Sequence, residues 1–399
     1  MMTLHNITKW RTLTFFAITL LLSSCNIQKQ VWFSDIQQKH EKIDDGISRV
    51  YIDKYGYVYP ENQYVSKDKF FDPKNNGSDL KELTTNGNLW DYYKNDSAEY
   101  HQLAAKYKVI IKKIDSVAFD AIQENIITQH VDQLKEKLGK SEDNTLVVLV
   151  HGFNVEDGTE DFNFLKKEIN TYKTNDYVYL DVYWDGNTTG NLAAPLKTIW
   201  GKAQLNSGYV AMALRRILAK MDTNTRIKII AHSLGSSVTT GALFSTYSKF
   251  KYPPVDLIKE NLKYPTSNAR DIRLGLIAPA IPGENTFVNF FERGQVHINK
   301  ETNTISKIVL GININDIAVS KAIRMSKKMG STSLGGDKDE YENTKAMLVK
   351  KLQYTQNEAD QLLQKVEFTN APKYKSAHGI KYYFMQDDKK NDFLKAIFD

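Results

Sequence analysis

The 399-residue chain contains a single cysteine, Cys25, and this scarcity narrows what the protein can be. One thiol cannot form an intramolecular disulfide, and no cluster of cysteines is available to hold a metal ion. The chain also lacks a His-Glu-x-x-His sequence, which would place two histidine ligands and a general base on one helix. A metal enzyme is therefore disfavoured, and the sequence indicates no cofactor.

Long hydrophobic runs are equally scarce. The most pronounced one, Leu13 to Leu22, follows Lys9 and Arg11 and leads into Ser23-Ser24-Cys25. The run is too short for a comfortable membrane span, and its order of basic, apolar and small residues is that of a secretory signal. No later stretch is long and apolar enough to cross a bilayer.

The end of this segment, Leu22-Ser23-Ser24-Cys25, resembles the lipobox of bacterial lipoproteins, in which cleavage precedes the cysteine and the thiol is then diacylated. An exported protein with one thiol has no disulfide to form, so lipidation accounts for the cysteine that it keeps. We therefore expect residues 1–24 to be a signal peptide and Cys25 to carry the lipid. The protein would then be exported and anchored to a bacterial membrane in the cell envelope, with polar residues 25–45 as a tether.

A strong excess of one charge is also missing. Without Lys9 and Arg11 the chain has 51 basic and 47 acidic residues, a net charge of +4. These charges are interspersed, so the sequence shows no electrostatic footprint for nucleic acid. The composition, 41% hydrophobic and 25% charged, is that of a globular protein, and the length suits one large domain with additions or two domains.

What the chain does contain is a series of apolar runs separated by helical patterns. A continuous apolar run such as Leu146 to Val150 is typical of a central parallel strand that is covered on both faces. Strands that alternate with helices predict a mostly parallel sheet built from right-handed crossovers, an α/β fold. The expected strands are 145–150, 177–184, 226–232, 272–278 and 305–312.

The chain before this region is expected to be an N-terminal α+β extension, residues 46–140. Bulky and polar residues alternate around a glycine from Arg49 to Pro60, which predicts a short hairpin. A long helix is expected from Ser116 to Leu138, because its apolar residues recur at helical spacing. The α/β domain would then occupy residues 141–399.

The most informative stretch passes from the strand-like run 226–232 directly into small residues that can open a helix. Ser233 lies at the corner, between Ala231 and Gly235. A serine at such a turn projects its hydroxyl out of the sheet, and its neighbours must be small because strand and helix approach closely there. Alanine replaces the first glycine of the usual G-x-S-x-G pattern. We interpret Ser233 as a nucleophile, although the pattern alone also fits a helix N-cap serine.

His151-Gly152-Phe153 ends the buried strand about 80 residues earlier. A loop in this position often supplies one backbone N–H of an oxyanion hole, and the residue after the nucleophile supplies the other. The predicted donors are therefore the N–H groups of Phe153 and Leu234. The alternative is a simple turn at the end of the strand.

A serine hydroxyl is a weak nucleophile unless an imidazole takes its proton and a carboxylate orients that imidazole. With a strand-to-helix nucleophile the chain order is serine, acid, histidine. Asp316, at the end of a strand, is the preferred acid, and Glu284, in a Pro/Gly loop, is the competitor. His378, in a late loop and followed by glycine, is the preferred base, because His297 lies inside a strand-like segment. A helical insert is expected between acid and base, at about residues 330–370, where it would cap the crevice.

Together these motifs make residues 145–399 resemble the α/β-hydrolase superfamily, and most closely a bacterial branch with a His-Gly-[Phe/Tyr]-Asn stretch. One departure is Ala280, which stands where that branch often has an aspartate after Ala-Pro. The resemblance implies a serine hydrolase acting through an acyl-enzyme, an esterase or lipase-like enzyme, with a small-molecule or lipid ester as substrate. The alternative is a non-catalytic lipoprotein that uses the same fold as a binding or scaffold module.

Overall fold

The computed structural model of the chain describes residues 28–29, 33–43, 45–65, 88–155, 157–186, 188–189, 196–245, 247–319, 328–329, 332–369 and 372–399. The expected signal peptide and Cys25 lie outside these residues, and so does part of the tether, so these calls stay predictions. Among the helices of the described ranges, none combines the length and the apolar character needed to cross a membrane.

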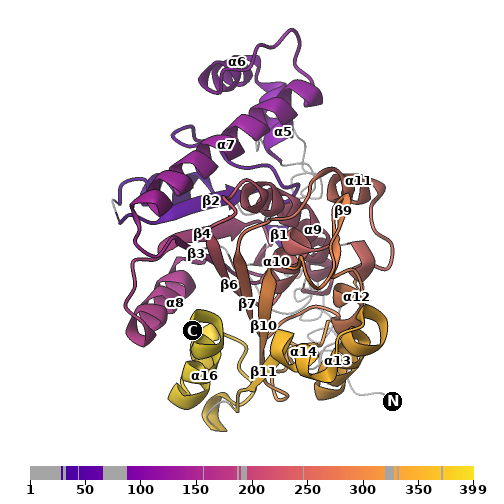
Figure 1. Cartoon of the computed structure of the whole chain (residues 1–399). Coiled ribbons are helices and arrows are strands. Elements are labelled where there is room, and N and C mark those ends of the chain that lie inside the picture. Colours follow the sequence, from indigo (N-terminus) through magenta and orange to yellow (C-terminus); the bar gives the residue numbers. More distant parts are fainter. Residues whose placement is uncertain are drawn as a thin grey trace, which may run out of the picture.

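A seven-stranded parallel sheet forms the centre of the molecule (Figure 1). Every neighbouring pair of its strands runs parallel, so the predicted α/β fold is confirmed. Strand β3 is buried along its whole length, as its continuous apolar sequence predicts. From one edge to the other the strands are β11 (Leu363–Glu367), β10 (Ile305–Ile312), β7 (Asp271–Ile277), β6 (Arg226–His232), β3 (Thr145–Val150), β4 (Val178–Trp184) and β2 (Ser48–Ile52).

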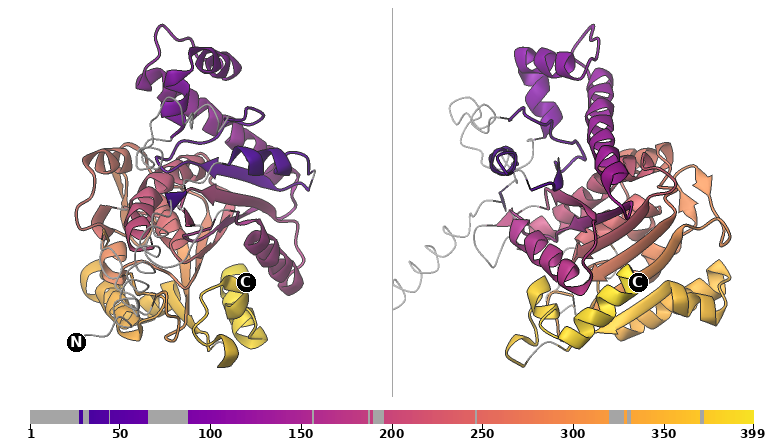
Figure 2. Two further views of the ribbon diagram at one scale, coloured as in Figure 1. Left: turned by 180° about the vertical axis from the view of Figure 1, so that it is seen from behind. Right: turned by 60° about the vertical axis from the view of Figure 1, so that its left-hand side comes forward.

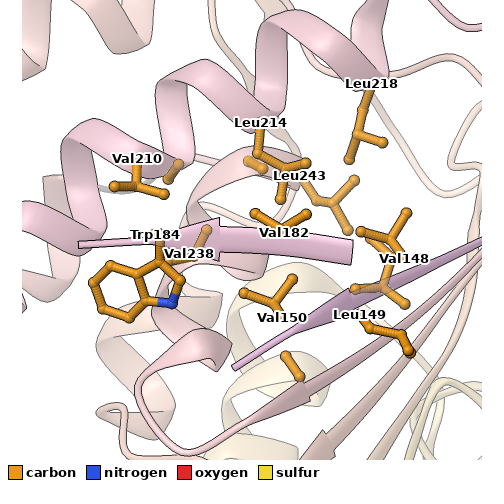
Figure 3. Packing of buried hydrophobic residues seen from close by; sticks show 14 of the residues in the cluster. Val148, Leu149, Val150, Val182, Trp184, Val210, Leu214, Leu218, Val238 and Leu243 are labelled. Atoms are coloured by element: carbon orange, nitrogen blue, oxygen red, sulfur yellow. The ribbon is translucent and has the colours of Figure 1, made fainter. Parts of the chain in front are cut away.

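Helices cover both faces of this sheet (Figure 2). On one face lie α9 (Leu196–Ala219) and α10 (Gly235–Leu243), which pack against each other. Figure 3 shows Leu214 of α9 and Leu243 of α10 close to Val148 and Val182 of the sheet. The long helix α7 (Ser116–Lys140) lies beside α9, close to where the sequence predicts it. On the opposite face, α8 (Thr159–Tyr172) contacts α16 (Asp387–Phe398).

The N-terminal extension adds a strand to the sheet, which the sequence does not predict. Residues 49–60 are not a regular hairpin, because β2 pairs in parallel with β4 and only one antiparallel bridge, Ile52 to Val58, follows. The Asp53 carboxylate accepts hydrogen bonds from the Tyr55 and Tyr57 N–H groups, both 2.9 Å, and so turns the chain as β2 ends. Strand β2 therefore pairs with the open edge of β4, whereas the hairpin pattern predicts that it pairs with the residues that directly follow it. The other helices of the extension are α5 (Leu89–Asn95) and α6 (Ser97–Lys106). Within the residues expected to be a tether, the chain instead forms helix α2 (Ser34–His40), because Phe33 and Ile36 are buried in the core.

The segment between Asp316 and His378 is also less helical than expected. Helices α13 (Lys338–Leu352) and α14 (Gln356–Leu362) are present, but the chain then enters β11, which pairs in parallel with β10. The helical insert expected at about residues 330–370 is therefore wrong from Leu363 onward, because the edge of β10 offers backbone hydrogen bonds that decide the structure there. The remaining short elements are β1 (Gln28–Lys29), β5 (Thr188–Thr189), η1 (Tyr247–Lys249), α11 (Val255–Lys263), α12 (Gly283–Phe287), β8 (Glu292–Arg293), β9 (Val296–His297), η2 (Pro372–Tyr374) and α15 (Ile380–Tyr383).

Candidate active site

Ser233 occupies the sharp turn between β6 and α10 and is only 5% exposed. Its φ angle is +52°, in the left-handed region that side chains other than glycine rarely adopt. The turn is held from both sides, because the Ser233 N–H donates to the Ile277 carbonyl at 2.9 Å and the Ser233 carbonyl accepts from the Ala280 N–H at 3.2 Å. A strained conformation that its surroundings hold so firmly is typical of functional positions.

The small residues around the turn are required by close packing against the end of β3. A Cβ atom on Gly235 would lie 2.5 Å from the His151 carbonyl oxygen and 2.8 Å from that of Val150, and backbone atoms cannot move away. A Cβ atom on Gly152 would lie 3.0 Å from the Ser233 Cβ. The loop after β3 therefore passes directly beside the candidate nucleophile.

His151 fixes the orientation of the peptide bond that carries the Phe153 N–H. Its Nδ1–H donates to the Gly152 carbonyl at 2.8 Å, while its Nε2 accepts from the Trp184 N–H at 3.1 Å. Burial lowers the pKa of His151 to about 4, so the ring is neutral and keeps this pattern at neutral pH. Because a trans peptide points its N–H opposite to its carbonyl, the Phe153 N–H is directed away from His151.

The two predicted oxyanion donors are the backbone N–H groups of Phe153 and Leu234. Within the described ranges, neither the Phe153 N–H nor the Leu234 N–H donates a hydrogen bond to another part of the chain. The Phe153 ring packs edge-on against Trp200, with 5.0 Å between ring centroids, and Leu234 is fully buried. Within the described residues neither amide is thus committed to a partner in the chain, as an oxyanion hole requires.

Asp316 and His378 are brought together across 62 residues of sequence. The His378 Nδ1–H donates to Asp316 Oδ2 at 2.7 Å, and the Tyr383 hydroxyl donates to the same oxygen at 2.6 Å. The second carboxylate oxygen accepts from the Ala318 N–H at 2.9 Å. Burial by itself would raise the pKa of the Asp316 carboxyl, but these hydrogen bonds and the nearby His378 hold it below its usual value. The carboxylate is thus charged and fully buried, as an orienting acid must be.

The alternative acid, Glu284, and the alternative base, His297, lie outside the hydrogen-bonded pair of Asp316 and His378. Glu284 is in the first turn of α12 and exposed to solvent, whereas the carboxylate that receives the His378 hydrogen bond is that of Asp316. His297 is in the exposed two-residue strand β9, with its ring against Phe291. Trp184, which the sequence leaves open between core and substrate contact, is completely buried and donates its ring N–H to the His151 carbonyl at 2.8 Å.

Sequence reasoning missed two residues of this site. Tyr383 carries no motif that separates it from the other 21 tyrosines, and only the fold brings it to Asp316. His232 stands beside Ser233, and its Nε2–H donates to the backbone carbonyl of His378 at 2.7 Å. The sequence signal that could have identified His232 is its position next to the candidate nucleophile. In the part of the chain that the structure describes, no group of three or more His, Cys, Asp or Glu side chains is arranged to hold a metal ion.

Comparison with known proteins gives one match. Residues 140–265 match the family model described as "Putative serine esterase (DUF676)". The match includes His151, Gly152 and Ser233 and ends before Asp316 and His378. Searches of curated proteins and of solved structures found no significant match. At the level of enzyme class, the match and the architecture agree on a serine hydrolase related to esterases, with an α/β-hydrolase type of fold.

Proposed function

We propose that the chain is a serine hydrolase that cleaves carboxylic esters through an acyl-enzyme, with Ser233 as nucleophile, His378 as base and Asp316 as the orienting acid. The observation that carries this proposal is the hydrogen bond between His378 Nδ1 and Oδ2 of the buried Asp316. The His232 side chain links the backbone of His378 to the turn that bears Ser233. Since Nδ1 holds the proton, the Nε2 lone pair is left to act as a base.

The reaction follows from these assignments. Ser233 Oγ attacks the ester carbonyl carbon as its proton passes to His378 Nε2, and the imidazolium then gives that proton to the departing alcohol. Water attacks the resulting acyl-enzyme, His378 takes a proton from the water, and the carboxylic acid leaves as Ser233 recovers its hydrogen. The negative oxygen formed in each attack would be stabilised by the N–H groups of Phe153 and Leu234.

The cellular part of the proposal rests on the N-terminal sequence. We propose that the protein is exported and held at a bacterial membrane of the cell envelope by acyl chains on Cys25, facing small-molecule or lipid esters. In cells fed a radiolabelled fatty acid, the wild type should carry the label and sediment with membranes. The variant Cys25→Ser should lose both properties, and unchanged membrane association in this variant would contradict the anchor.

Catalysis is tested with nitrophenyl esters of increasing acyl length. The wild type should hydrolyse at least one ester of the series, and Ser233→Ala should reduce the rate to the background of uncatalysed hydrolysis. The acyl length with the highest kcat/KM would show whether short esters or lipids are preferred. A folded wild type that hydrolyses none of them, yet binds an ester stably, would instead favour the non-catalytic binding module.

A further inference from the structure

His232 joins three parts of the site. It is the last residue of β6 and directly precedes Ser233. Its ring lies against that of His378, with 4.7 Å between centroids, and its Nδ1 would lie 3.2 Å from a Cβ atom on Gly152. The ring therefore fills the space between the nucleophile turn, the loop of the base and the loop after β3.

Two backbone carbonyl groups of the loop that carries His378 accept hydrogen bonds from side chains of other segments. The His232 Nε2–H donates to the His378 carbonyl at 2.7 Å, and the Asn313 side-chain amide donates to the Lys375 carbonyl at 3.1 Å. Asn313 follows β10 and also holds the turn that presents Asp316, because its Oδ1 accepts from the Asn315 N–H at 3.1 Å. Asn313 thus anchors the start of this loop beside the acid, whereas His232 anchors the base residue itself beside the nucleophile.

The chemistry of the ring suits a permanent anchor. Burial, with a smaller effect of the neighbouring His378, lowers the pKa of His232 to about 3, so the ring stays neutral over the whole range in which an esterase works. A neutral ring with its proton on Nε2 leaves Nδ1 as an acceptor, and this buried atom has no hydrogen-bond partner within the described residues. A buried polar atom without a partner destabilises the fold, so a residue that retains one calls for a functional reason.

We propose that His232 is a positioning residue that holds the base His378 beside the turn bearing Ser233 through its hydrogen bond to the His378 backbone carbonyl. This inference rests on the proposed function, because it assigns His232 a task within that reaction. His232 itself exchanges no proton with the substrate. A displacement of about 1 Å in a reacting group can lower a rate about a hundredfold, so one backbone hydrogen bond can control the turnover.

The test compares His232→Leu, which removes the donor, with His232→Gln, whose side-chain amide can reach the same carbonyl. Each purified full-length variant is measured for kcat and KM on the best nitrophenyl ester, for the rate of labelling by a fluorophosphonate probe, and for its melting temperature. We expect His232→Leu to lower kcat and the labelling rate at least about tenfold while KM changes less than about twofold. His232→Gln should recover to within about threefold of the wild type.

A purely structural role would lower the melting temperature of both variants without this separation of kcat from KM and without rescue by glutamine. Equal labelling rates for the wild type and His232→Leu would overturn the inference, and so would equal losses in the leucine and glutamine variants. These outcomes differ from failure of the proposed function, in which the folded wild type itself takes up no probe and the inference falls with it.

Discussion

The Tyr383 hydroxyl and the His378 ring donate to the same oxygen, Asp316 Oδ2, at 2.6 and 2.7 Å. Tyr383 and Asp316 are both fully buried, so this hydrogen bond is shielded from bulk solvent. The carboxylate that orients the candidate base is therefore held by a residue that takes no part in the chemical steps.

Removing this hydroxyl should impair turnover. In Tyr383→Phe the buried carboxylate keeps the His378 and Ala318 donors but loses the third, so its orientation is less firmly fixed. We expect kcat to fall about threefold to tenfold, which corresponds to the net strength of about one hydrogen bond. Steady-state kinetics at neutral pH would measure this.

Tyr341→Phe is the matched control for this measurement. Tyr341 is also buried, and its hydroxyl donates to the Leu363 carbonyl at 3.0 Å, in the contact between α13 and β11. The control should lose a similar amount of stability and keep the wild-type kcat. Equal kcat values in both variants would contradict a role for Tyr383 at the acid.

The identity of the acid can be tested directly. Asp316→Asn should lower kcat about ten-thousandfold, because the neutral amide no longer holds the His378 ring in the tautomer that the reaction needs. Glu284→Gln changes an exposed carboxylate of α12 in the same way and should leave kcat unchanged. If the two variants behaved in the opposite manner, the acid would be Glu284.

The positive φ of Ser233 predicts an unusual effect on stability. Ser233→Gly and Ser233→Ala should both be inactive, but the glycine variant should be the more stable by about 1 kcal/mol, because glycine adopts φ of +52° without strain. Thermal or denaturant unfolding would measure the difference. Ser236, the second residue of α10, provides the control, since glycine should there be less stable than alanine by up to about 1 kcal/mol. The same order of stability at both positions would rule out strain at Ser233.

Two buried neutral histidines predict a loss of stability in acid. Burial lowers the pKa of His151 to about 4 and that of His232 to about 3, whereas each titrates near 6.5 in an unfolded chain. Between these values the unfolded state binds more protons, so the free energy of unfolding falls as the pH falls below about 6.5. Each histidine should contribute a loss of about 2 to 3 kcal/mol by about pH 4.5.

Urea unfolding at a series of pH values would measure this dependence. His232→Leu removes one of the two groups, so its free energy of unfolding should depend less steeply on pH between about 6.5 and 4.5, by close to one proton. If the free energy of unfolding of His232→Leu depended on pH as steeply as that of the wild type, His232 would not be a neutral buried group in the folded state.

The sequence predicts the central strands and the order of the site because both depend on local patterns. A short continuous apolar run such as that of β3 favours a buried strand. The resemblance to α/β-hydrolases implies the chain order in which acid and base are sought. The parallel pairing of β2 with β4 and the strand β11 escape prediction, since both are decided by open strand edges that lie far away in sequence. Tyr383 escapes for a similar reason, because its contact with Asp316 spans 67 residues and leaves no local signal.

The central claim is that Ser233 is an activated nucleophile, and a fluorophosphonate probe tests it most directly. Incubated at neutral pH, the folded wild type should gain the mass of one probe molecule, located by peptide mapping at Ser233, and Ser233→Ala should gain none. Labelling of Ser233 should also fall sharply in His378→Ala, because the serine then lacks its base. Absence of label from the folded wild type, or label that persists in Ser233→Ala, would contradict the account.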